Sequence, residues 1–288
     1  MRIDMRLGFA LLAAALLSGC ALLGEKPAPT PAPVPVKIGL ALGGGAARGF
    51  AHVGVIKALE AQGIVPDIIV GTSAGAVVGA LYAGGLNGFE LQKLAMEMDE
   101  SQVGDWSLPD RGVLKGEGVQ NYVNKAVHNV PIEKFKIPFG AVATDLRTGQ
   151  PILFQRGNAG TAVRASSAVP GVFQSVRIGD HTYVDGGLVS PVPVRFARQM
   201  GADFVIAVNI SANPEAQAAS SSSIDVLLQT FAIMGKSINT FELRDADVVV
   251  RPALQGIASS DFSARKRSIE AGRQAMLRAI PELKAALA

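Results

Sequence analysis

The residues best suited to chemistry, by type and spacing, lie in the stretch Gly71-Thr72-Ser73-Ala74-Gly75. Residues 66–70 before it are apolar and β-branched, which is typical of a buried strand, and residues 76–83 after it are typical of a packed helix. Ser73 therefore falls on a tight turn between strand and helix, the G-x-S-x-G arrangement that presents a nucleophilic hydroxyl. The helix N-terminus behind it favours developing negative charge. The alternative is a strand-to-helix turn whose serine has no chemical role.

A glycine loop at residues 43–49 follows an earlier strand, residues 36–42, and precedes a helix, residues 50–60. Its glycines do not have the G-x-G-x-x-G spacing of a dinucleotide-binding loop ending on Gly49, so a nucleotide is disfavoured. The carboxyl ends of parallel strands meet at one edge of a sheet, and the loop would therefore face Ser73. Backbone N–H groups of Gly44, Gly45 and their neighbours could then form an oxyanion hole.

A serine nucleophile needs a base, and the histidines of the chain are His52, His128 and His181. His52 lies on an apolar helical stretch, where a buried histidine with a satisfied hydrogen bond is the expected state. The other two are expected on the surface or in turns. A triad of Ser73 with His181 and an upstream acid such as Asp145 stays open as an alternative, although no motif supports it.

The stretch Asp185-Gly186-Gly187 is the third feature with chemical potential. Taken alone, an aspartate before two glycines is typical of a turn. In the usual hydrolase order a histidine follows the acid, and no histidine follows Asp185 in this chain.

The elements that must position these residues form an alternating series of strands and helices. Strand, glycine loop and helix recur about 30 residues later as strand, G-x-S-x-G and helix, which predicts parallel strands covered by helices. Further strands are expected at residues 139–144, 151–154, 182–187, 204–209 and 248–250. Further helices are expected at residues 87–98, 119–129, 159–167, 224–243 and 265–279. The polar residues 99–118 are expected to form a surface loop or lid.

The N-terminal residues are expected to carry address and spacing rather than fold. A positively charged start precedes an apolar run, residues 7–17, which is short for a membrane span and leads to Leu17-Ser18-Gly19-Cys20, similar to a bacterial lipobox. Residues 1–19 are expected to be a lipoprotein signal peptide, and residues 20–36 a lipidated Cys20 with a stiff Pro-rich tether. Ala21 favours a lipid-anchored position in the bacterial cell envelope, at the outer membrane facing the periplasm. An ordinary signal peptide or a hydrophobic anchor is the alternative.

Composition restricts the broad class of the protein. With 288 residues, of which 49% are hydrophobic, the chain can build a sizeable core, and residues 37–288 are expected to form one domain. The formal net charge of +3, without a basic block, disfavours nucleic acid as a partner. Cys20 is the single cysteine, so neither an intrachain disulfide nor a cysteine-based metal site can form.

Three ordered motifs together resemble the patatin-like phospholipase family: the glycine loop, the Gly71–Gly75 stretch and Asp185-Gly186-Gly187. Residues 166–173 and 190–194 also resemble bacterial members, and the resemblance covers roughly residues 37–210. It implies an α/β three-layer sandwich, with a mostly parallel central sheet between helices. It also implies a Ser–Asp dyad, in which Asp185 is the base for Ser73 and no histidine is catalytic.

The resemblance further implies that the oxyanion hole is built from Gly44, Gly45, Ala46, Ala47, Arg48 and Gly49. The family usually has glycine where this chain has Ala46, which keeps its N–H but has less backbone freedom. Arg48 would either brace the loop or meet a lipid phosphate. Neither a metal nor another cofactor is implied.

The function expected from these residues is a lipid-anchored serine esterase that cleaves acyl esters of phospholipids or lysophospholipids through an acyl-enzyme. Two alternatives stay open. One is a general esterase or thioesterase acting on soluble acyl substrates, and the other is a non-catalytic envelope lipoprotein that holds a lipid or a partner.

Overall fold

The computed structural model describes residues 35–99, 114–214 and 223–287. The expected signal peptide, Cys20 and the tether up to residue 34 lie outside the described residues, as do residues 100–113 of the expected loop or lid. Residues 36–288 form one compact unit. Among the described ranges, no helix is both long and apolar enough to cross a membrane.

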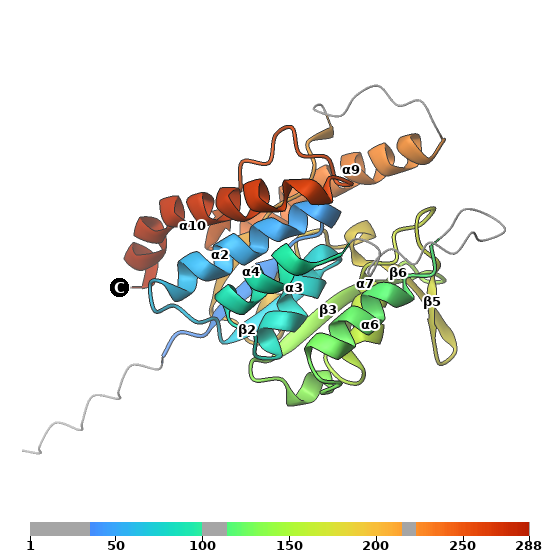
Figure 1. Ribbon diagram of the computed structural model, residues 1–288, viewed down its shortest axis with the longest axis horizontal. Coiled ribbons are helices and arrows are strands. Elements are labelled where there is room, and N and C mark those ends of the chain that lie inside the picture. Colours follow the sequence, from blue (N-terminus) through green and yellow to red (C-terminus); the bar gives the residue numbers. More distant parts are fainter. Residues whose placement is uncertain (1–34, 100–113, 215–222, 288) are drawn as a thin grey trace, which may run out of the picture. The chain divides into compact units, whose positions relative to one another are not determined.

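One eight-stranded sheet organises this unit, in the order β5-β6-β3-β2-β1-β7-β8, with β4 beside β3 (Figure 1). The strands are β1 (Ile38–Leu42), β2 (Ile68–Thr72), β3 (Phe139–Asp145), β4 (Pro151–Phe154), β5 (Val176–Ile178), β6 (His181–Asp185), β7 (Phe204–Val208) and β8 (Val248–Val250). Strands β3, β2, β1, β7 and β8 run parallel to their neighbours in this series. Strands β4, β5 and β6 add antiparallel pairings. The expected mixed α/β fold with a mostly parallel central sheet is confirmed.

Helices cover both faces of the sheet. They are α2 (Phe50–Glu60), α3 (Ala74–Ala83), α4 (Gly88–Glu97), α6 (Glu117–Ala126), α7 (Ala159–Ser166), α8 (Val194–Gln199), α9 (Ser223–Glu242) and α10 (Arg265–Leu287). Short 3-10 turns are η2 (Ala46–Gly49), η3 (Ile132–Lys134), η4 (Gly186–Leu188), η6 (Leu243–Asp245) and η7 (Phe262–Ala264).

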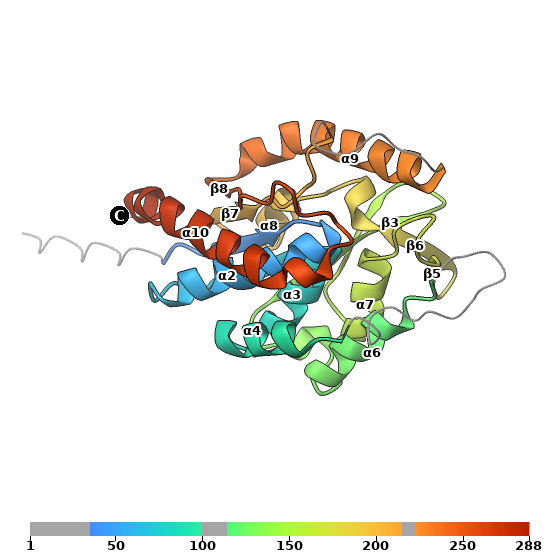
Figure 2. The ribbon, with the colours of Figure 1, turned by 45° about the horizontal axis from the view of Figure 1, so that its top comes forward.

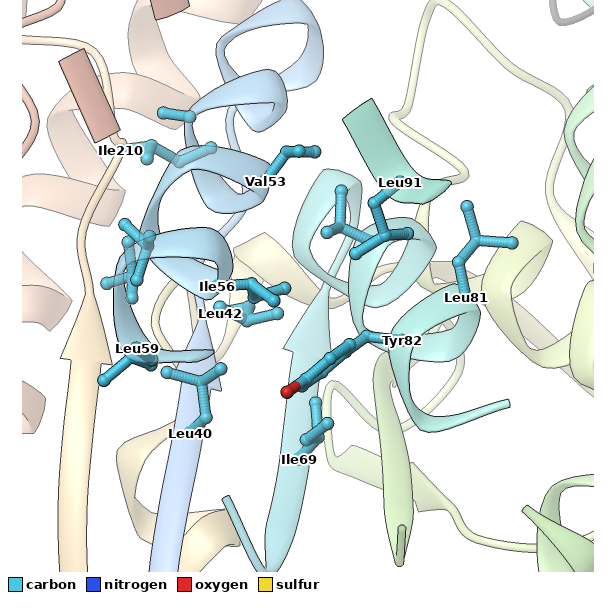
Figure 3. Packing of buried hydrophobic residues seen from close by; sticks show 14 of the residues in the cluster. Leu40, Leu42, Val53, Ile56, Leu59, Ile69, Leu81, Tyr82, Leu91 and Ile210 are labelled. Carbon is cyan, nitrogen blue, oxygen red and sulfur yellow. The ribbon is translucent and has the colours of Figure 1, made fainter. Parts of the chain in front are cut away.

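Alternate residues of the central strands supply two separate cores. Leu40 and Leu42 of β1 pack with α2, α3 and α10 in the larger core, part of which is drawn in Figure 3. Ala41, between them, faces the smaller core, where Val194 and Phe196 of α8 cover the sheet. Strands that are buried on both faces have no polar side, which explains their continuous apolar sequences.

Helices α2 and α10 lie side by side in both views and approach each other through two glycines (Figures 1 and 2). A Cβ built on Gly54 would lie 1.8 Å from the Ile269 carbonyl oxygen, and one on Gly272 would lie 1.9 Å from the Ala51 carbonyl oxygen. The two backbones are therefore in direct contact, and α10 holds α2 and the glycine loop before it against the sheet.

The element boundaries differ from the expected ones where local geometry ends a pattern. Strand β2 continues to Thr72 and α3 begins at Ala74, so the turn at Ser73 is tighter than expected. Helix α6 ends at Ala126, before the left-handed residues His128 and Asn129. Gly186 and Gly187, expected to continue the strand, form η4 together with Leu188, and α10 continues past residue 279 to Leu287. The three-residue strand β5 and the six-residue helix α8 were not predicted, because such short elements carry no readable period.

Candidate active site

Ser73 is the single residue between β2 and α3. Its backbone has φ 53 and ψ −121, a strained conformation that costs about 1 to 3 kcal/mol for a residue with a side chain. The Ser73 N–H donates to Ser166 Oγ at 2.9 Å, and the Ser73 carbonyl accepts the N–H of Ala76 at 2.8 Å. The surrounding bonds therefore hold the strained turn in place.

The two glycines of this turn leave no space for a side chain. A Cβ on Gly71 would lie 2.4 Å from the backbone nitrogen of Ala76, and one on Gly75 would lie 2.0 Å from the Leu42 carbonyl oxygen. The G-x-S-x-G spacing is thus required by backbone contact between β2, α3 and the end of β1.

The glycine loop runs directly beside Ser73, because a Cβ on Gly44 would lie 3.3 Å from Ser73 Cβ. Its N–H groups are not all available, contrary to the expectation for the whole loop. The N–H of Gly44 donates to Pro191 O at 2.9 Å, that of Ala47 to Ser259 O at 2.9 Å, and that of Arg48 to Gly45 O at 3.1 Å. Within the described ranges, the N–H groups of Gly45 and Ala46 have no hydrogen-bond partner. Gly45 and Ala46 are therefore the candidate donors of this loop to an oxyanion.

Two buried residues with titratable side chains, Arg48 and His52, lie at this loop. Ala46 has a left-handed φ of 50 and starts η2, which carries Arg48 inward. The Arg48 guanidinium is buried, which lowers its pKa, and its Nε has no partner within the described residues. His52 is fully buried and contacts the Gly43 carbonyl oxygen through Nε2 at 2.8 Å, so it supports the loop from below. Burial lowers the pKa of His52 to about 4. The residue is buried and hydrogen-bonded as expected, but its Nδ1 has no partner within the described residues.

Asp185 ends β6 and is held at its backbone on both sides. Its N–H donates to Ala168 O at 3.0 Å, and its carbonyl accepts the Thr144 hydroxyl at 2.8 Å. Carboxylate Oδ1 accepts the Gly187 N–H at 2.7 Å, which gives the aspartate-glycine-glycine motif its local purpose. A Cβ at Gly186 would lie 2.2 Å from the Val142 carbonyl oxygen, so a glycine is needed for the chain to pass this oxygen.

The Asp185 carboxyl and the Ser73 hydroxyl come together across β3, which pairs with β2 on one side and β6 on the other. Burial raises the pKa of Asp185 to about 6, partly offset by the Gly187 N–H and by the Ser73 hydroxyl. The Ser73 hydroxyl is near enough to lower this pKa, and Oδ2 has no hydrogen-bond partner within the described residues. A carboxyl group with a raised pKa thus lies beside the strained Ser73.

Two hydroxyl residues that were not singled out as site residues fix this geometry. Ser166 bridges the Ser73 N–H and the Val142 carbonyl. The Thr72 hydroxyl donates to Ser190 O at 2.8 Å and ties the end of β2 to the segment after Asp185. Both are fully buried, Ser166 at the end of α7 and Thr72 at the end of β2, and a hydroxyl in an otherwise apolar stretch is a signal that could have identified them, because a buried hydroxyl needs a partner.

The structure brings together His181 and Asp145, the pair of the alternative triad, but within the described residues neither forms a hydrogen bond with Ser73. His181 contacts Asp145 Oδ2 through Nδ1 at 2.6 Å, and this contact, followed by the Thr148 N–H, lowers the pKa of Asp145 to about 2. His181 is separated from Asp185 by four residues along an extended strand, a span of about 13 Å. His128 lies in the exposed left-handed turn after α6. The described residues contain no group of three or more side chains suited to a metal ion.

Comparison with known proteins identifies the same family that the sequence motifs resemble. The family model described as patatin-like phospholipase matches residues 40–198. An uncharacterized NTE family protein of Mycobacterium tuberculosis is 40% identical over 173 residues, which cover 59% of this chain and 48% of the relative. Patatin-like phospholipase domain-containing protein 6 of Mus musculus is 31% identical over 182 residues, which cover 60% of this chain and 13% of that protein. The matches thus span about half or less of these relatives.

Among solved structures, VipD from Legionella pneumophila superposes with a TM-score of 0.59 at 13% sequence identity, covering 85% of this chain and 66% of that one. At this identity the likeness concerns the fold. Since the family model matches more than half of the chain and includes both Ser73 and Asp185, this protein belongs to the patatin-like phospholipase family.

Proposed function

We propose that this protein is a serine hydrolase that cleaves the acyl esters of phospholipids or lysophospholipids through a Ser73–Asp185 dyad. One observation carries the proposal: a strained, buried serine lies beside a buried carboxyl whose pKa is raised to about 6 and whose Oδ2 is unpartnered within the described residues. A carboxylate with a raised pKa is a better base for a hydroxyl, and it remains ionised at neutral pH.

The chemistry proceeds in two balanced halves. Ser73 Oγ attacks the ester carbonyl carbon while its proton passes to Asp185 Oδ2. When the tetrahedral intermediate collapses, the carbon–oxygen bond to the alcohol breaks and Asp185 returns the proton to the leaving oxygen. Water then attacks acyl-Ser73, gives a proton to Asp185, and releases the fatty acid as the serine regains its proton.

The oxyanion formed in each half needs donors that are free before the substrate arrives. The N–H groups of Gly45 and Ala46 meet this requirement, and that of Gly44 does not because it is engaged with Pro191. Donors that are already fixed in position are the most effective electrostatic stabilisers of such an intermediate.

The location of the enzyme is part of the proposal. Leu17-Ser18-Gly19-Cys20 supports lipidation at Cys20, and residues 20–36 would tether the domain to a lipid surface of the cell envelope. In the producing cell, Cys20→Ala should leave an unprocessed precursor that lacks the lipid. A mature-sized, detergent-partitioning Cys20→Ala protein would contradict lipidation.

The dyad is tested by Ser73→Ala, Asp185→Asn and the double variant. Each single variant should lose about 10³-fold or more in kcat/KM, and the double variant should be little worse, because the two residues act as a unit. His181→Ala is the matched control and should keep its activity, since His181 lies about 13 Å along β6 from Asp185, the carboxyl beside Ser73. An inactive His181→Ala enzyme with an active Asp185→Asn enzyme would show that the alternative triad is correct.

The substrate class is tested on the same proteins with micellar phospholipid, micellar lysophospholipid and dissolved short-chain esters and thioesters. Preference for the micellar lipids supports the proposal. Preference for dissolved substrates favours a general esterase or thioesterase, and a lack of Ser73-dependent turnover on every substrate would indicate a binding protein.

A further inference from the structure

Helix α9 exposes an unusual apolar surface. Ten large apolar residues are well exposed in the described part of the chain, and half of them lie on this helix: Val226, Leu228, Ile233, Met234 and Phe241, of which Phe241 is 66% exposed. Lys236 is the only charged residue between positions 226 and 241. At about 100° per residue, Val226, Ile233, Met234 and Phe241 share one side of the helix, while Leu228 lies on the opposite side. A helix side that faces water normally carries charges, and an apolar one marks an interaction site.

This helix lies over the edge of the sheet that carries the candidate active site. Glu242 at its end accepts the Ser190 hydroxyl and pairs with Arg195, and the Ser190 carbonyl accepts the hydroxyl of Thr72, the neighbour of Ser73. A Cβ on Gly235 would lie 3.5 Å from Pro191, in ordinary contact. Through these contacts α9 covers the segment that follows Asp185, while Figure 2 shows its length running beyond α8.

A basic hollow of about 510 Å³ lies on the flank of the same helix. Its walls include Lys236, Arg244 and Arg251, together with the polar side chains of Asn209, Ser211, Asn213, Asn239 and Thr240. Arg244 lies over the ring of the exposed Phe241, at 5.0 Å from its centroid. Asn239 is 4% exposed, and its Oδ1 has no partner within the described residues, so the hollow offers a buried acceptor beside its cations.

We propose that α9 and this hollow form a docking surface for an anionic lipid surface. The apolar side chains enter the acyl region, and the three cations meet the phosphates of the headgroups. Apolar residues on one face of a helix with cations at its flank are the features that hold a helix in a membrane interface. This inference rests on the proposed function and deepens it, because docking here places the edge of the sheet with Ser73 at the lipid that it hydrolyses.

The test uses the fragment of residues 36–288, which contains every described strand and all of the described core. The fragment carries Ser73→Ala, so vesicles are not degraded during the measurement. Co-sedimentation with vesicles of phosphatidylcholine alone, and of phosphatidylcholine mixed equally with phosphatidylglycerol, gives the partition coefficients. Stronger partition into the mixed vesicles is expected, and it should weaken with salt.

The apolar contribution is measured with the triple variant Ile233→Ser, Met234→Ser and Phe241→Ser. Its partition coefficient should fall by about 1,000-fold, because each of the three buried side chains contributes about tenfold. The matched control is Val65→Ser with Phe89→Ser, which removes two equally exposed apolar residues elsewhere and should leave partition unchanged. Thermal unfolding verifies that each variant is folded, and Ile233→Glu alone serves if the triple variant is not.

The ionic contribution is measured with Lys236→Gln, Arg244→Gln and Arg251→Gln combined. The preference for anionic vesicles should fall by about 100-fold, since each cation near such a surface contributes about fivefold. A variant with Lys93→Gln, Lys134→Gln and Arg147→Gln has the same net charge and should keep most of the preference.

Three results would overturn the proposal: partition of the apolar triple variant equal to that of the parent, an equal effect of the two charge variants, or a dimer of the parent that the apolar triple variant disrupts. The last would assign α9 to a second copy of the chain. Binding is measured without turnover, and turnover of dissolved esters is measured without vesicles, so failure of the docking surface is distinguishable from failure of the proposed function.

Discussion

Helices α9 and α10 are the two longest of the described chain, at 20 and 23 residues. They differ in which side chains they bury and which they expose. Helix α10 buries a regular stripe that includes Ile269, Met276 and Leu283, and its backbone touches α2 through Gly272. Its other positions carry charges: Arg265, Lys266, Arg267, Glu270, Arg273, Arg278, Glu282 and Lys284. Helix α9 instead turns apolar side chains outward and is attached to the unit by few residues, Glu242 among them.

The difference shows where this molecule is built for stability and where for function. On the α10 side, apolar surface is buried and charge is solvated. The active-site side instead contains strained backbone at Ser73 and Ala46, and an Asp185 Oδ2 that has no partner within the described residues. It also contains Glu242, whose burial raises its pKa to about 7. Strain and unsatisfied groups of this kind concentrate at functional sites, because binding or chemistry uses them.

The largest effect is expected from the same substitution made on each helix. Gly272→Ala places a Cβ 1.9 Å from the Ala51 carbonyl oxygen and must separate α10 from α2, which should cost about 4 kcal/mol of unfolding free energy. Gly235→Ala on α9 meets only ordinary contacts and should stabilise by up to about 1 kcal/mol, through helix propensity. Urea unfolding of both variants measures the two changes. Equal losses would remove the distinction between the helices.

A pair of methionines gives the next largest contrast. Met276 on α10 is fully buried, and Met276→Ala should cost about 3 kcal/mol through the cavity that it leaves. Met234 on α9 is 43% exposed, and Met234→Ala should change the unfolding free energy by less than about 0.5 kcal/mol. A large loss from Met234→Ala would show that α9 is part of the stabilising core.

At the active-site edge, a small change should affect rate more than stability. Gly45→Val would crowd Ile210, whose carbonyl oxygen lies 3.0 Å from the position of the added Cβ, and would displace the N–H groups of Gly45 and Ala46. We expect kcat to fall by about 10²-fold, the scale of one lost oxyanion donor. A melting curve verifies that the variant is folded, and wild-type kcat in Gly45→Val would remove this loop from the mechanism.

Asp185 should affect stability and activity in opposite directions. Its folded pKa of about 6 exceeds the ordinary 3.8, so its favourable contribution is complete below about pH 4 and is lost as the pH rises through 6. Asp185→Asn should therefore be about 3 kcal/mol more stable than wild type at pH 7, with the difference shrinking to nearly nothing below about pH 4. The base must be ionised, so wild-type kcat/KM should rise with pH through about 6. A flat pH profile, or a less stable Asp185→Asn protein, would contradict this account.

The smallest effect is expected at Ala46, whose φ of 50 is unfavourable for alanine. Ala46→Gly relieves that strain but gains entropy in the unfolded chain, so stability should change by less than about 1 kcal/mol. The N–H is kept, and kcat should be unchanged or slightly higher. A tenfold loss of kcat would mean that the methyl group itself positions the loop.

Much of the fold followed from local pattern. The apolar strands around Leu40 and Val70, and the glycines at 71 and 75, predicted a parallel sheet with Ser73 on a strand-to-helix turn, because strand burial and tight turns restrict residue types directly. Short elements such as β5 and the extension of α10 to Leu287 did not follow, since three residues or a proline near a helix end leave no clear period.

The sequence by itself determined which residues could do chemistry, because Ser73, Asp185 and the glycine loop are distinctive in type and spacing. Only the tertiary structure decided which of their groups are available. The N–H of Gly44 donates to Pro191, and His181 contacts Asp145. Oδ2 of Asp185 has no partner within the described residues. All three outcomes depend on contacts between segments that are distant in the sequence. Exposure of the apolar face of α9 is likewise tertiary, since an apolar residue is a core residue only when another element covers it.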